Sequence, residues 1–110
     1  MANSFKNSVR PSIGTTPVDV YTAGAGVTAT IISLSLANRI DYSVQVDVQI
    51  TDTSTANSAF LVKGVAVDPG GTFVLIGGDQ KLVLETTDKI TVSSSLASSV
   101  DCVISILEQV

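Results

Sequence analysis

The stretch YSVQVDVQITD at residues 42–52 decides the fold, because apolar and polar side chains alternate along it without a break. The apolar parity holds Tyr42, Val44, Val46, Val48 and Ile50. Successive side chains of a β-strand point to opposite faces, so this spacing predicts a strand with one buried and one solvated face. On a helix the same residues would be spread around the whole circumference.

Most of the chain repeats this period of two, with turn residues between the segments. Asp68-Pro69-Gly70-Gly71 is a strong turn signal of this kind. Further strands are expected at residues 18–22, 27–37, 59–67, 72–76, 81–85, 89–95 and 100–108. About eight or nine strands, with turns every 8–12 residues or so, are typical of a sandwich. We therefore expect an all-β protein, a two-layer antiparallel β-sandwich of jelly-roll or immunoglobulin-like type with essentially no α-helix.

The chain is expected to form a single domain with a distinct beginning. Residues 1–16 are interpreted as an N-terminal arm or an edge strand, because Phe5 and Val9 are apolar among polar neighbours. Pro11 and Gly14 then interrupt regular structure. The sandwich domain itself is assigned to residues 17–110.

The expected strand at 27–37 changes phase in its middle. Val27, Ala29 and Ile31 share one parity, whereas the apolar residues from Ile32 onward take the other. Such a change indicates a β-bulge or a strand that passes from one sheet to the other. A strand buried on both faces would give the same pattern.

Composition bears on partners and location. The net charge is −4 and the Lys and Arg residues are scattered singly, which argues against nucleic acid as a partner. No span is long enough for a membrane helix, and the start has no apolar leader, so we expect synthesis in a reducing cytoplasm without membrane association. A mean hydropathy of +0.45 is high for so small a domain. We therefore expect a homo-oligomer, a trimer or larger ring, that covers the excess apolar surface.

The sequence predicts no catalytic, cofactor-binding or metal-binding residues. It contains no histidine, which excludes Ser-His-Asp and Cys-His sites. Cys102 is the single cysteine, and it falls on an apolar strand parity where a thiol behaves as a small hydrophobe. The carboxylates adjoin turns or outward strand positions, which is typical of a solvated surface. Asp79, Glu85 and Asp88 lie close in sequence and leave open a weak ion site.

Several segments resemble small virion structural proteins of tailed bacteriophages, especially phages of marine cyanobacteria. The resembling segments are MANSFKNSV (1–9), VYTAGAGVTATIISLSLAN (20–38), FLVKGVAV (60–67), GGDQKLVLETTDKITV (77–92) and SSLASSVDCVISILE (94–108). Two turns, at residues 21–26 and 86–88, depart from the family by lacking a proline and a glycine respectively.

The resemblance implies a non-enzymatic building block of the virion, first of all a capsid decoration or cement protein that binds other virion proteins such as the major capsid protein. The alternatives are a neck, tail or fibre-attachment subunit, or a host-surface carbohydrate-binding module. Phe5, Lys6, Val9 and Arg10 of the N-terminal segment are the predicted interface residues.

Overall fold

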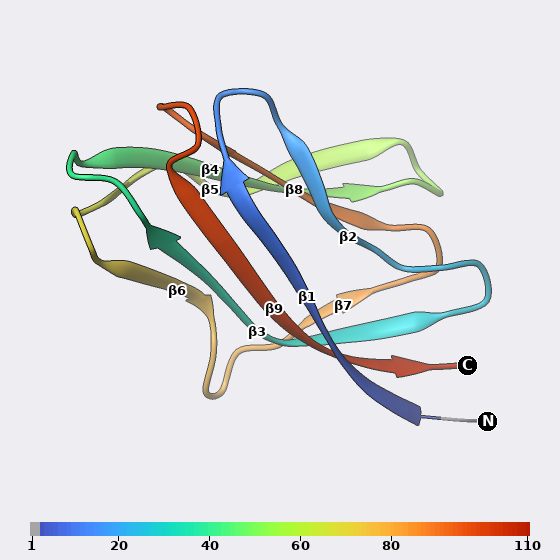
Figure 1. Ribbon diagram of the computed structural model, residues 1–110. Coiled ribbons are helices and arrows are strands. Elements are labelled where there is room, and N and C mark those ends of the chain that lie inside the picture. Colours follow the sequence, from blue (N-terminus) through green and yellow to red (C-terminus); the bar gives the residue numbers. More distant parts are fainter. Residues whose placement is uncertain (1–2) are drawn as a thin grey trace.

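The computed structural model describes residues 3–110, which form nine β-strands in two antiparallel sheets (Figure 1). The strands are β1 (Asn3–Ile13), β2 (Val18–Thr22), β3 (Thr28–Asn38), β4 (Val44–Asp52), β5 (Asn57–Val67), β6 (Thr72–Ile76), β7 (Leu82–Leu84), β8 (Lys89–Ser94) and β9 (Val100–Gln109). The five-stranded sheet has the order β1-β9-β3-β6, and β7 also pairs with β3. The four-stranded sheet has the order β2-β8-β4-β5.

The predicted fold class is confirmed. The described part of the chain contains only strands, turns and loops, and the two sheets stack with β1 near β2. Across residues 3–110, no helix is long and apolar enough to cross a membrane.

The core lies between the sheets and consists almost entirely of Val, Ile, Leu and Ala side chains. In the four-stranded sheet, Val44, Val46 and Val48 of the opening stretch are buried, as their parity predicts. Opposite them, β9 contributes Cys102, Ile104 and Ile106. β-Branched side chains dominate because they fit a pleated surface in few rotamers, which gives two thin layers rather than a deep aromatic core.

The phase change in β3 is a β-bulge. The register of β3 against β9 shifts between Ile31 and Ser33, so Ile31 and Leu34 both point into the core although their numbers differ in parity. Both halves of β3 pair with β9, and the strand stays in one sheet. The extra residue, Ile32, is only partly buried.

The predicted start of this strand at Tyr42 is wrong. Strand β4 begins at Val44, and Tyr42 is 70% exposed. The reason is Asn38, a buried side chain at the end of β3. Its amide donates to the carbonyls of Tyr42 (2.8 Å) and Val67 (3.0 Å), and its oxygen accepts from the Ile40 amide at 3.0 Å. These bonds hold residues 39–43 as a turn rather than as strand.

The segment interpreted as an arm or edge strand is strand β1. It pairs with β9 from Asn3↔Gln109 to Ile13↔Val100, which places the start of β1 beside the end of β9 (Figure 1). Met1 and Ala2 of that segment lie outside the described residues.

Candidate functional site: an apolar sheet face

The outer face of the five-stranded sheet carries two rows of paired residues that run across its strands. One row follows Val9↔Val103↔Ser35↔Val74. The second row follows Phe5↔Leu107↔Thr30↔Val83. Directly paired residues of neighbouring strands project from the same side of a sheet, so each row is one continuous strip. We call the two rows together the apolar face.

The apolar face exposes large hydrophobic side chains to solvent. The exposed fractions are 79% for Phe5, 60% for Val9, 60% for Val74, 57% for Val83 and 42% for Val103. Between the rows lie small neutral residues, with Asn7 paired to Ser105 and Ser105 to Ser33. Clustered exposure of this kind is typical of contact surfaces, whereas single exposed hydrophobes are ordinary.

In the first part of strand β1, the apolar side chains of Phe5 and Val9 point outward, whereas Lys6, Ser8 and Arg10 point toward the other sheet. Lys6 and Arg10 pair with Ile106 and Cys102, whose side chains point inward. Lys6, Ser8 and Arg10 therefore lie on the side of β1 that faces strand β2, as the bond from the Ser8 hydroxyl to the Val20 carbonyl (2.7 Å) shows.

The four predicted interface residues consequently do not share one surface. Phe5 and Val9 belong to the apolar face, and Lys6 and Arg10 lie on the opposite side of the same strand. Lys6 has a local partner there, because its Nζ lies 2.9 Å from Glu108 Oε1. A strand with period two separates residues of odd and even number, so these four side chains point in two directions.

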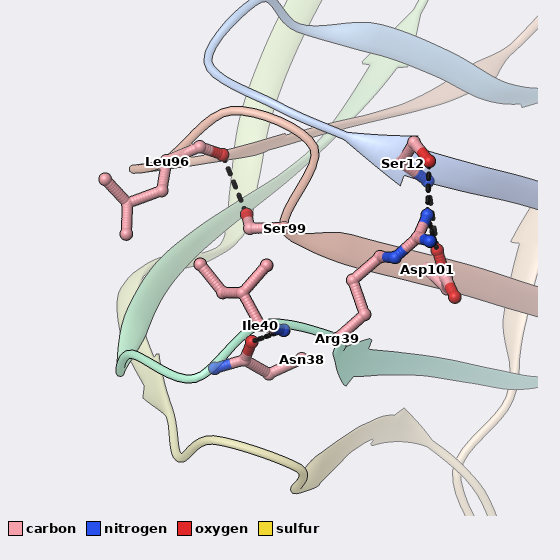
Figure 2. Close-up of polar contacts among 7 residues, drawn as sticks. All are labelled: Ser12, Asn38, Arg39, Ile40, Leu96, Ser99 and Asp101. Carbon is pink, nitrogen blue, oxygen red and sulfur yellow. Dashed lines mark hydrogen bonds and ion pairs between the residues drawn. The ribbon is translucent and has the colours of Figure 1, made fainter.

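Charge is confined to the border of the apolar face. At one end, Arg39 Nη1 lies 3.5 Å from Asp101 Oδ1 and also donates to the Ser12 hydroxyl, as Figure 2 shows. The Ser12 amide donates to the same Asp101 oxygen at 2.9 Å. Because cation and anion neutralise each other, this end presents no net charge. The serine accepts a bond from a guanidinium, which does not activate it as a nucleophile.

The outer face of the four-stranded sheet differs in character. It carries Asp19 next to Lys89, with a side-chain distance of 3.5 Å, and Thr91 donating to Asp19 at 3.0 Å. Phe60 is exposed there, with Lys63 Nζ 4.5 Å from its ring centre. The two faces of the sandwich are thus one neutral and apolar, the other polar and charged.

Cys102 lies in the core between the sheets and is fully buried. Burial raises the pKa of its thiol to about 12, because the thiolate would lose its hydration. At neutral pH this group is a protonated, inaccessible side chain that serves packing.

The acidic cluster differs from the one considered in the sequence. Carboxylate oxygens of Asp52, Glu85 and Asp88 lie within 4.8 Å of one another, and Asp79 is not part of the group. Asp88 is buried, contrary to the expected solvated surface, and accepts from the amides of Thr53 (3.2 Å) and Glu85 (3.1 Å). Its carboxylate thereby closes two turns, which accounts for its position.

Asp52 also has local partners. Its Oδ1 accepts from the hydroxyl of Ser54 at 2.7 Å, and this bond lowers the pKa of the carboxyl. Asp79 lies instead beside a shallow groove of about 520 Å³ between β5 and the β6–β7 connection. That groove is lined by Leu61, Leu75, Ile76, Asp79, Gln80, Lys81 and Leu82.

Comparison with protein-family models and with curated proteins gives no match. Two solved structures share the fold. A chain of Bacillus endospore appendages, described as a novel family of disulfide-linked pili, is similar with a TM-score of 0.52 and 14% identity over 97% of this chain and 85% of that one. A chain of the T13 particle of infectious bursal disease virus is similar with a TM-score of 0.52 and 9% identity. The likeness covers 96% of this chain and 35% of the viral one, so it spans about a third of the latter. Identities this low show the fold alone.

Sequence reasoning missed most of the apolar face. Val103 and Leu107 carry a signal, because β9 is apolar on both parities and only one of them can face the core. Val74 and Val83 carry no such signal, since each sits on a short strand whose register against β3 is a property of the fold.

Proposed function

We propose that this protein is a non-enzymatic structural subunit of a bacteriophage virion, present in many copies as a capsid decoration or cement protein. The observation that carries the proposal is the apolar face. A neutral surface exposing Phe5, Val9, Val74 and Val83 is unfavourable in water and is suited to permanent contact within an assembly.

The fold and the sequence resemblance support this role from two sides. The solved chains that share the fold come from a pilus and from a virus particle. The resemblance of residues 77–92 and 94–108 to phage virion proteins points to the phage particle among such assemblies. On this proposal the protein is made in the host cytoplasm, forms a homo-oligomer and binds other virion proteins such as the major capsid protein.

A structural role also accords with the state of the residue types that most often act in catalysis, histidine and cysteine. The sequence has no histidine, and the one thiol is buried and protonated. Because Cys102 is inaccessible, the proposed assembly is non-covalent, unlike the disulfide-linked pili to which the fold is similar. Many weak contacts, each repeated across a particle, sum to a large stabilisation.

A neck, tail or fibre-attachment subunit is the second candidate, and the likeness to a pilus chain favours it because a tail is also a linear assembly. Copy number separates the two roles. Quantitative mass spectrometry of purified particles should give copies on the order of hundreds for a shell protein, and one or a few rings for a neck or tail subunit. Absence of the protein from purified particles would refute both.

A further inference from the structure

We propose that the partner of the apolar face is a second copy of this chain, packed face to face about a two-fold axis parallel to the strands. The inference deepens the proposed function and rests on its claim that this face is a contact surface.

Electrostatics favour a second copy over a different partner. All residues of the two rows are uncharged, and so are Asn7, Ser105 and Ser33 between the rows. The Arg39–Asp101 pair at one end of the face is neutralised. Complementary charge is the usual means of specifying a foreign partner, and this face offers none. Each copy carries a net charge of −4, so two copies repel least where they meet through a neutral surface.

The two rows of one copy are also complementary to the same two rows of a second copy. A two-fold axis along the strands, between β9 and β3, places β1 of one copy over β6 and β7 of the other. Phe5 then lies over the partner copy's Val83 position, and Val9 over its Val74 position. In the middle, Val103 faces the position of Ser35 and Leu107 that of Thr30, so large side chains meet small ones. Packed sheets interdigitate in this way at a spacing of roughly 10 Å.

The face is large enough for a specific dimer. Strands β1 and β9 hold 11 and 10 residues, which at roughly 3.3 Å per residue gives a length of about 33 Å. Four strands at about 4.8 Å add a width of about 19 Å. The resulting projected area of about 600 Å² per copy reaches the lower end of specific interfaces, before surface relief is counted.

Both edges of the four-stranded sheet, by contrast, are protected against pairing. The β4–β5 register shifts twice, and the edge strand β5 carries Lys63 followed by Gly64 at a φ of 70°. At the edge of the same sheet, β2 has a register shift between Asp19 and Tyr21. Bulges and charged side chains are the devices by which natural sheets prevent edge-to-edge association.

The pairing differs from the trimer or larger ring expected from the sequence. A ring needs two different complementary surfaces on each subunit, whereas one face that meets its own copy closes at two. The described surface offers one neutral apolar face opposed to a charged one, which favours the closed pair.

Sedimentation equilibrium of the purified full chain tests the proposal, with Val103→Lys and Val74→Lys as interface variants. Phe60→Lys is the matched control, since it places the same charge at an exposed hydrophobe of the opposite sheet. We expect the wild type and Phe60→Lys to be dimers. Each interface variant should raise the dimer dissociation constant at least about 30-fold, the effect of losing one strong interface contact. Circular dichroism of each variant establishes that the fold is retained.

Three results would overturn the inference: a wild-type monomer at tens of micromolar, a closed trimer or larger ring, or a dimer broken by Phe60→Lys and not by Val103→Lys. The variant Val74→Lys keeps the test decisive if Val103→Lys does not fold. The measurement uses the isolated protein, so a dimer that is absent from phage particles would refute the proposed function and leave this inference standing. A protein that is monomeric in solution but present in many copies on particles would refute this inference and leave the proposed function standing.

Discussion

Replacing Tyr21 by phenylalanine tests the contact that joins the two sheets beside β1. The Tyr21 hydroxyl, on β2, donates to Glu108 Oε2 of β9 at 2.5 Å. The other oxygen of Glu108 lies 2.9 Å from Lys6 Nζ on β1. One carboxylate therefore holds three strands, and its two partners differ in exposure. The Lys6 side chain is 57% exposed, whereas Tyr21 is only partly exposed, and the side chain of Glu108, which both contact, is 13% exposed.

The difference in exposure decides which partner contributes more. A hydrogen bond to a charged, mostly buried acceptor contributes about 1.5–3 kcal/mol, and an exposed ion pair about 0.2–1 kcal/mol. We expect Tyr21→Phe to lower the free energy of unfolding by about 2 kcal/mol. For a domain of this size that corresponds to a fall in Tm of about 8 °C. Lys6→Met should cost less than about 1 kcal/mol.

The effect of Tyr21→Phe should depend on pH. The hydrogen bond from Tyr21, followed by that from Lys6, lowers the pKa of Glu108 in the folded protein. A lowered folded-state pKa contributes stability that is complete above the ordinary glutamate pKa of about 4.3 and is lost as the pH falls through the folded value. Wild type and Tyr21→Phe should therefore differ fully at pH 7 and converge in acid.

Urea unfolding at one fixed protein concentration, at pH 7 and at pH 3, measures these differences. The reasoning is refuted if Lys6→Met destabilises more than Tyr21→Phe at pH 7. It is also refuted if the cost of Tyr21→Phe is the same at both pH values.

Three further predictions concern the core and the loops. Cys102 should resist a thiol reagent at pH 7 and react at the rate of global unfolding; rapid labelling of the folded protein would contradict its burial. Asn38→Ala should lower the free energy of unfolding, measured in urea, by at least about 2 kcal/mol, because it leaves buried backbone groups unpaired. The exposed control Asn57→Ala should change it by no more than about 0.5 kcal/mol. Equal losses of stability in the two variants would contradict the role of Asn38. Gly14→Ala should lower the free energy of unfolding by about 1–3 kcal/mol, because its new Cβ lies 3.1 Å from a backbone nitrogen. Gly24→Ala should lower it less, because its Cβ meets only a side chain at 3.6 Å. A Gly14→Ala variant as stable as the wild type would contradict this contact.

The architecture was predictable because a period of two is a local property of the chain. The stretch around Val44, Val46 and Val48 shows its buried face directly. The phase change at Ile31 and Ile32 located the irregularity in β3, but it did not distinguish a bulge from a change of sheet or from a strand buried on both faces. The start of β4 was not predictable, since Tyr42 is held in a turn by a side chain that also binds the distant Val67.

The candidate site was predictable only in part. Phe5 and Val9 could be separated from Lys6 and Arg10 by parity alone, although their surroundings could not be known. The rest of the apolar face depends on strand register. Val74 and Val83 lie on separate strands that both pair with β3, and local sequence does not specify that arrangement. The same holds for the acidic cluster, in which Asp52 comes from a strand far from Asp88 in sequence.

Crosslinking at the centre of the apolar face tests the central claim most directly. Ser105 lies between the two rows, and Ser93 lies on the outer side of the four-stranded sheet, paired with Asp47. The native thiol is buried and should not react. With a bismaleimide whose reach matches the roughly 10 Å between packed sheets, Ser105→Cys should be captured as a covalent dimer and Ser93→Cys should remain monomeric. Efficient crosslinking of Ser93→Cys, with none for Ser105→Cys, would contradict the account.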